Sequence, residues 1–233
     1  MPKRKGTGTG TRTALPPPLS TLARVAVDLS QLARPDRTAL LIFEMQRGIV
    51  GDLHLMPALA AAVREAGLVS QIGALTAAGR PAGVRVVHCT VEWRADRRGT
   101  MLNTPLVAGI ASRHPEHILV GSKRAEIVPA LRPQDGDLVS TRRSGLSAFV
   151  GTELDTTLRA MGVTTVVLSG AALALGLLAT AFEAVNRGYS VVVPREAAVD
   201  IDPEFGQIVW ERTFRLIAAR TTVDELVSIW RTG

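Results

Sequence analysis

Residues 162–194, GVTTVVLSGAALALGLLATAFEAVNRGYSVVVP, decide the fold class of this chain. Two short aliphatic runs, Thr164–Ser169 and Tyr189–Val193, flank a helical stretch, Leu173–Asn186, which ends shortly before Gly188. Short runs of this composition predict buried strands, and a glycine just beyond a helix is a common helix end. A strand, a helix and a second strand at this spacing predict a right-handed crossover between parallel strands.

The same alternation of strands and helices continues on both sides of this block. Three further strands are predicted, at Thr38–Glu44, Val84–Cys89 and Leu138–Thr141. Four further helices are predicted, at Pro57–Ala78 with Gly79 as its end, at Thr152–Met161 with Gly162 as its end, at Phe205–Ala219 and at Val223–Trp230. Residues 92–122 show no clear element, so we expect a long functional loop or lid there. These segments predict a three-layer α/β/α fold around a parallel sheet of about six strands.

Composition agrees with one aliphatic core. Of 233 residues, 46% are hydrophobic but only 4% are aromatic, which suits the branched-aliphatic strands of a parallel sheet. Residues 1–20 are rich in Gly, Thr and Pro and are predicted to form a disordered basic tail. Residues 21–37 are predicted to form an N-terminal arm, and residues 38–233 a single folded domain.

The net charge of +6 lies mostly in the N-terminal segment. Residues 1–37 hold seven basic and two acidic residues, so +5 of the charge belongs to this segment and +1 to the remaining chain. A nucleic-acid surface instead concentrates Lys and Arg on a folded face. We therefore do not expect nucleic acid as a partner.

Cysteine count and hydropathy exclude further classes. One cysteine, Cys89, leaves no internal disulfide framework and no multi-cysteine metal cage. No apolar run reaches the length of a membrane span, and prolines at 16–18 interrupt the apolar residues behind the basic N-terminus. We expect a cytoplasmic protein that acts on or binds a small molecule and needs no cofactor.

Charged side chains close two of the predicted strands. Glu44 ends the first strand, and Arg142 and Arg143 follow the Leu138–Thr141 strand. Ligands of parallel sheets bind beyond the carboxyl ends of the strands, so these side chains are candidate site residues. A partly desolvated carboxylate suits proton transfer, and a nearby arginine would hold that carboxylate or an anionic substrate. The alternatives are a structural glutamate and a surface ion pair of little energetic value.

Three segments carry a resemblance to a known family. LLIFEMQ (40–46), SAFVGTELD (147–155) and the block from GVTTVVLSG to ATAFEAVNRGYSVVV (162–193) follow one another in the order and spacing of the isochorismatase-like hydrolases, also called the cysteine hydrolase family. The chain resembles that family over about residues 38–195. The resemblance implies hydrolysis of a small molecule and assembly into a homodimer or homotetramer.

The resemblance also implies catalytic positions, and this chain differs from the family at each of them. Glu44 stands where the family usually has an aspartate, and Gln46 follows it as in the family pattern, which makes Gln46 a candidate substrate-binding residue. Arg142 or Arg143 stands where the family has a lysine. The nucleophilic cysteine of the amidases corresponds to Gly176.

These differences determine which chemistry is expected. Glu44 keeps a carboxylate, whereas an arginine keeps the charge of lysine without a proton that it can release. A glycine at 176 cannot form an acyl-enzyme. The family also has a non-proline cis peptide beside its oxyanion-binding backbone. Its counterpart here lies between Ala171 and Ala172, whose N–H groups are expected to bind substrate.

Other residues near the strand ends are candidates for site roles. Trp93 and Arg94 follow the second strand and are expected to contact a planar or anionic ligand, the alternatives being an oligomer contact or a solvated run of charges. Cys89 is either a thiol at the rim of the site or a core residue. His114 and His117 have ligand-like spacing, but Pro115 between them favours a loop, so no metal site is expected.

Two functions remain open from the sequence. The first is a hydrolase that works without a cysteine nucleophile and uses Glu44 as acid or base. The second is a catalytically inactive family member that serves as a ligand-binding or assembly module.

Overall fold

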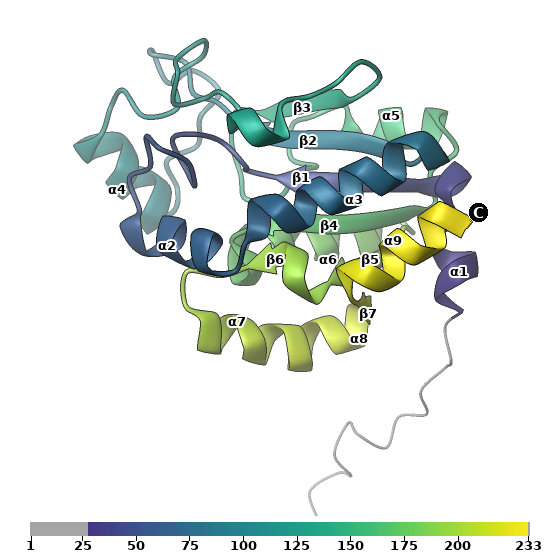
Figure 1. The fold of residues 1–233 in the computed structure, drawn as a ribbon. Helices are drawn as coiled ribbons and strands as arrows, with labels where there is room; N and C mark the ends of the chain where they lie inside the picture. Colours follow the sequence, from purple (N-terminus) through teal and green to yellow (C-terminus); the bar gives the residue numbers. More distant parts are fainter. Residues whose placement is uncertain (1–27, 233) are drawn as a thin grey trace, which may run out of the picture.

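Seven parallel strands form the centre of the protein, as shown by a computed structural model that describes residues 28–232 (Figure 1). The strands run in the order β3-β2-β1-β4-β5-β7, and β6 pairs with β4 beyond the end of β5. Their bounds are Thr38–Phe43 for β1, Arg85–Val91 for β2, Leu138–Arg142 for β3, Thr165–Ala171 for β4, Ser190–Pro194 for β5, Ala198–Val199 for β6 and Ala219–Thr221 for β7.

Helices cover both faces of this sheet, which confirms the predicted three-layer α/β/α class. Their bounds are Leu29–Leu32 for α1, Pro57–Glu65 for α2, Leu68–Ala82 for α3, Pro105–Arg113 for α4, Leu154–Ala160 for α5, Leu178–Asn186 for α6, Pro203–Val209 for α7, Arg215–Ile217 for α8 and Val223–Thr232 for α9. In Figure 1, α3 and α9 lie in front of the sheet and α5 and α6 behind it. Short 3₁₀ turns at 35–37, 129–131 and 195–197 and π-helical turns at 173–177 and 210–214 complete the regular structure.

The central strand explains why the sequence shows a continuous apolar run. All six residues of β1 are buried. Leu40 and Ile42 pack into the core under α3 and α9, whereas Leu41 and Phe43 pack into the core under α5 and α6. A strand covered on both faces has no solvent side, so its side chains do not alternate between apolar and polar.

The helix predicted at Pro57–Ala78 is wrong in its extent. It is two helices, α2 and α3, which meet at Gly67 with a bend of 56°. Gly67 adopts a left-handed backbone conformation with φ of 60°, which ends α2 and allows the change of direction. Gly79 lies within α3, which continues to Ala82 and ends at Gly83.

Residues 92–122 contain a helix that the sequence reading missed. Helix α4 begins at Pro105, and the hydroxyl of Thr104 accepts a hydrogen bond from the Val107 N–H at 3.2 Å. A threonine cap followed by proline is an ordinary helix start. The predicted helix at Phe205–Ala219 also differs, because it begins at Pro203, contains a π-helical turn and gives way to β7.

The predicted N-terminal arm is described only from Asp28, and the predicted tail at 1–20 lies outside the described residues. The described part of the arm packs against the domain. Trp230 Nε1 donates to the Ala33 carbonyl at 3.0 Å, and Thr165 Oγ1 donates to the Leu32 carbonyl at 2.7 Å. Within residues 28–232, no single helix is long and apolar enough to cross a membrane.

Candidate active site

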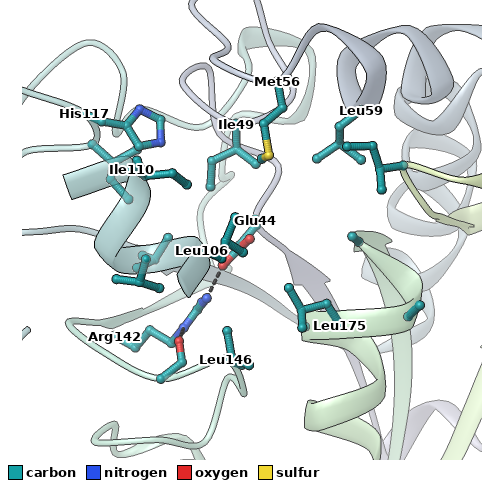
Figure 2. A pocket seen from close by; sticks show the side chains of 18 of the residues that line it. Glu44, Ile49, Met56, Leu59, Leu106, Ile110, His117, Arg142, Leu146 and Leu175 are labelled. Carbon is teal, nitrogen blue, oxygen red and sulfur yellow. Dashed lines mark hydrogen bonds and ion pairs between the residues drawn. The ribbon is translucent and has the colours of Figure 1, made fainter. Parts of the chain in front are cut away.

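A cavity of about 440 Å³ opens at the carboxyl ends of the central strands. Glu44 enters it from the end of β1, Val91 from β2, Arg142 from β3 and Ala172 from the residue after β4. The position agrees with the rule that parallel sheets bind ligands beyond their carboxyl ends. Figure 2 shows side chains converging on this space from α2, α4 and the strand ends.

The floor of the cavity holds an ion pair between Glu44 and Arg142 (Figure 2). Arg142 Nη2 donates to Glu44 Oε1, and Arg142 Nε donates to the Gly145 carbonyl at 3.2 Å. The Arg142 side chain is only 4% exposed, and its second terminal nitrogen, Nη1, has no hydrogen-bond partner within the protein. One guanidinium nitrogen is therefore buried without a hydrogen bond from the protein.

Glu44 is presented to the cavity by an unusual backbone conformation. Its φ of 52° lies in the left-handed region, which a residue other than glycine rarely adopts. Its N–H still donates to the Cys89 carbonyl at 2.9 Å, so the backbone is anchored to β2. Such conformations gather at functional sites, where the surrounding structure fixes them.

Arg143 takes a different partner from Arg142. Arg143 Nη1 donates to Glu92 Oε2 at 3.1 Å, and the Arg143 side chain is 42% exposed. Neither residue of this second pair lines the cavity. The structure thus brings Arg142 beside Glu44 and leaves Arg143 outside the candidate site.

Gly176 lines the cavity at the π-helical turn that follows β4, and the ring of Phe43 packs directly against it. A Cβ atom placed on Gly176 would lie 2.2 Å from Phe43 Cε1 and 2.6 Å from Phe43 Cζ. The Arg142 guanidinium also lies against this ring, with its central carbon 4.8 Å from the ring centroid. The space that a side chain at position 176 would need is therefore filled by an aromatic ring.

The walls of the cavity are almost wholly aliphatic. They are formed from α2 and the segment before it, from α4 and the loops on both sides of it, and from the loops that follow β3, β4 and β6. The larger apolar side chains are Ile49, Met56, Leu59, Met101, Leu106, Val107, Ile110, Ile118, Leu146, Leu175, Ile201 and Phe205. A ligand that fills this space must itself be largely apolar.

Two polar side chains that carry a buried, unpartnered atom interrupt the apolar wall away from the ion pair. His117 is 3% exposed, and its Nδ1 has no partner within the protein. The hydroxyl of Thr100 is also buried and unpartnered. Burial lowers the pKa of His117 to about 4, with the cation of Arg124 acting in the same direction, so its imidazole is neutral at pH 7.

The other residues expected to bind substrate fall into different places. Gln46 is fully buried and does not line the cavity. Its amide nitrogen donates to the Val91 and Ala125 carbonyls at 2.9 and 2.8 Å, and its amide oxygen accepts from the Val91 N–H. All of its polar atoms are therefore engaged with the backbone. Arg94 is exposed and pairs with Asp96. Trp93 does line the cavity and contacts His117 edge-on, with ring centroids 5.9 Å apart.

The peptide bond between Ala171 and Ala172 is cis, as the family resemblance led us to expect. Ala172 lines the cavity, whereas Ala171 is fully buried and does not. Ser169 and Gly170 precede this bond at the end of β4, where Gly170 has φ of 119° and packs against the Phe43 carbonyl.

Asp200 lines the cavity and was missed by the sequence reading. Its Oδ2 accepts from the Ala174 N–H at 2.6 Å, and its Oδ1 accepts from the Asp202 N–H at 3.2 Å. Asp202 in turn caps α7 through the N–H groups of Glu204 and Phe205. The Asp200 carboxylate fixes the turn that carries Gly176, and nothing in the local sequence distinguishes either aspartate from a surface acid.

Cys89 is a core residue. It is 1% exposed, lies outside the cavity lining and packs in the core under α5 and α6. Burial raises the pKa of its thiol to about 12, which removes the thiolate needed for nucleophilic attack. In residues 28–232, no group of three or more His, Cys, Asp or Glu side chains is placed to hold a metal ion.

The fold and this strand-end site define a three-layer α/β protein with a ligand cavity at the carboxyl edge of its sheet, and comparison with known proteins gives the family. Residues 38–225 match the model of the isochorismatase domain. The chain therefore belongs to the isochorismatase family of hydrolases.

Individual relatives support this assignment. The isochorismatase family protein YwoC of Bacillus subtilis is 36% identical over 103 residues, which cover 44% of this chain and 54% of that relative, so the matched part spans about half of its length. The maleamate amidohydrolase of Pseudomonas putida is 28% identical and covers 74% of this chain and 83% of its own. The crystal structure of an isochorismatase family protein from Desulfovibrio vulgaris superposes with a TM-score of 0.71 at 28% identity, over 83% of this chain and 97% of that one.

Proposed function

We propose that this protein is an isochorismatase-family hydrolase in which water, rather than a cysteine thiol, attacks the substrate, with Glu44 as the acid/base residue. The observation that carries the proposal is the Glu44–Arg142 pair at the floor of an apolar cavity. The fold supplies the cavity, and the pair is the one acid–base combination within hydrogen-bond contact on its described lining.

The position of Gly176 supports a mechanism without a covalent intermediate. Glycine has no side chain to act as nucleophile, and Phe43 fills the neighbouring space. Cys89 is protonated and buried elsewhere. We infer that a water molecule beside Glu44 takes the nucleophile's role.

The ion pair favours the base role for Glu44 over the acid role. A carboxylate that accepts a hydrogen bond from a guanidinium is in its charged form and can take up a proton. Arg142 cannot serve in its place, because guanidinium does not give up its proton in proteins. Glu44 would take a proton from water while the water oxygen attacks a substrate carbonyl carbon.

The remaining steps follow from the same two side chains. Arg142 Nη1, which has no protein partner, would donate to the carbonyl oxygen as negative charge develops on it. When the intermediate collapses, the bond from carbon to the leaving nitrogen or oxygen breaks. Glu44 would then return its proton to that leaving atom, which restores the ion pair.

The second pair, Glu92–Arg143, provides a matched control for the test. A panel of small apolar amides and esters is assayed with the wild-type protein and with two variants. Glu44→Gln should lower the turnover of any substrate found by at least about 100-fold, the scale of general acid–base catalysis. Glu92→Gln removes the same kind of charge outside the cavity and should leave turnover within about twofold. Equal losses in the two variants would contradict the role of Glu44.

A ligand-binding module without turnover is the alternative that one observation favours. Arg142 neutralises Glu44, and the Phe43 ring closes the space next to Gly176, so the cavity can hold a ligand without attacking it. In that case the panel gives binding but no turnover, and Glu44→Gln changes only affinity or stability.

A further inference from the structure

The unpartnered polar atoms of the cavity divide into two groups. Arg142 Nη1 lies at the floor beside Glu44, whereas His117 Nδ1 and Thr100 Oγ1 belong to the segment that carries α4. Figure 2 shows His117 above and Arg142 below α4 in the view, with Ile110 and Leu106 of that helix between them. A buried polar atom without a partner costs free energy, so both groups call for a ligand atom.

The charges around the cavity argue against an anionic ligand. Glu44, Asp200 and Asp202 contribute three negative charges, and Arg142 contributes one positive charge. His117 adds none, because burial keeps it neutral. A carboxylate in the ligand would meet a net negative lining and would compete with Glu44 for Arg142.

The His117 ring is held in place by its neighbours. The Trp93 ring contacts it edge-on. The Arg97 guanidinium in turn stacks on Trp93, with its central carbon 4.8 Å from the Trp93 ring centroid. A neutral imidazole carries one donor and one acceptor nitrogen. A hydroxyl or an uncharged amide, which both gives and accepts a hydrogen bond, matches this ring better than a charged group.

The cavity volume limits the size of the ligand. A water molecule takes about 30 Å³ in the liquid, so 440 Å³ corresponds to about 15 non-hydrogen atoms. Since the walls between the two polar ends are aliphatic, most of these atoms must be carbon.

We propose that the ligand is an uncharged molecule of up to about 15 non-hydrogen atoms with a carbonyl at the Arg142 end, an apolar body, and a neutral hydrogen-bonding group such as hydroxyl at the His117–Thr100 end. This inference rests on the proposed function for the site that it describes, but it concerns binding alone. It therefore can be tested with compounds that water does not hydrolyse.

Two methyl ketones and one acid of matched length serve as probes in titration calorimetry. They are 5-(4-hydroxyphenyl)pentan-2-one, 5-phenylpentan-2-one, which lacks the hydroxyl, and 4-phenylbutanoate, which has a carboxylate in place of the methyl ketone. We expect the wild-type protein to bind the hydroxyl ketone about 2- to 13-fold more tightly than the plain ketone, the range of one hydrogen bond. We expect the carboxylate to bind more weakly than either ketone.

Variants locate the effect. His117→Leu should abolish the preference for the hydroxyl, and His117→Gln, which keeps a donor and an acceptor, should retain part of it. His114→Leu changes the neighbouring histidine outside the cavity and should leave the preference intact.

The proposal is overturned if none of the three probes binds, if the carboxylate binds most tightly, or if His117→Leu keeps the hydroxyl preference. A hydroxyl preference that depends on His117, in a protein that hydrolyses nothing in the panel, would contradict the proposed function and leave this inference standing. Turnover that depends on Glu44, without any preference for the hydroxyl ketone, would support the proposed function and overturn this inference.

Discussion

Introducing a cysteine at position 176 tests whether this site has lost the space for a nucleophile as well as the nucleophile itself. The Cβ of Gly176→Cys would lie 2.2 Å from Phe43 Cε1, so the ring must move by about 1.2 Å to reach the 3.4 Å of an ordinary contact. Phe43 is 1% exposed and stacks on Arg142, so it has little room to move. We expect a loss near the upper end of the range for overpacking, about 3 kcal/mol of unfolding free energy.

A second substitution identifies the cause. Phe43→Val removes the ring and should cost about 2–4 kcal/mol by itself, through lost burial and the lost contact with Arg142. In the double variant the valine leaves space for the cysteine. The double variant should therefore lose about 1–3 kcal/mol less unfolding free energy than the sum of the losses in the two single variants. The measurement is urea unfolding with linear extrapolation.

Gly73 supplies the control, because it also lies in a helix and a Cβ built on it meets nothing within 4 Å. Gly73→Cys should cost no stability and can gain some, as a glycine replaced within a helix often does. If Gly176→Cys were as stable as Gly73→Cys, and the double variant showed no coupling, the reasoning about Phe43 would be refuted.

Three further outcomes are expected from the same structure. Arg142→Leu leaves the Glu44 carboxylate without its partner in a mostly desolvated position and should cost about 2–4 kcal/mol of unfolding free energy. Arg143→Leu breaks an exposed pair and should cost under about 1 kcal/mol. Urea unfolding at pH 7 compares the two variants, and equal losses would argue against a desolvated Glu44–Arg142 pair. The pKa of His117 is lowered from 6.5 to about 4 in the folded protein, so the unfolded chain binds this proton first as the pH falls. The free energy of unfolding should therefore drop by up to about 3 kcal/mol between pH 6.5 and pH 4 because of this residue, and His117→Gln should flatten that part of the profile in urea unfolding. An unchanged profile would show that the ring is not desolvated. Cys89, with its pKa raised to about 12 by burial, should not react with a thiol reagent in the native protein and should react once after unfolding; rapid native labelling would contradict its place in the core.

The sequence predicted the layers of the fold because its strong signals are local. The runs at β1, β2 and β4 are aliphatic from end to end, and buried parallel strands have that composition. The break at Gly67 was missed because a single glycine within a long apolar stretch does not by itself indicate a bend. The two short strands were missed because β6 and β7 have two and three residues, too few for any periodicity.

The site was predictable in outline and not in detail. Glu44 could be placed at a strand end from the sequence, but the choice between Arg142 and Arg143 depends on which side of the edge strand faces the cavity, and no local pattern fixes this. Gln46 was misplaced because its burial depends on carbonyls of two distant segments. The contact between Phe43 and Gly176 joins residues 133 positions apart, so only the folded chain reveals it.

The most direct test of the account is intact-protein mass spectrometry of samples quenched during turnover of a substrate from the panel. We expect the mass of the wild-type chain to stay unchanged at every time point, because water attacks the carbonyl without a covalent intermediate. A transient mass increase equal to the acyl part of the substrate, on any side chain, would contradict it.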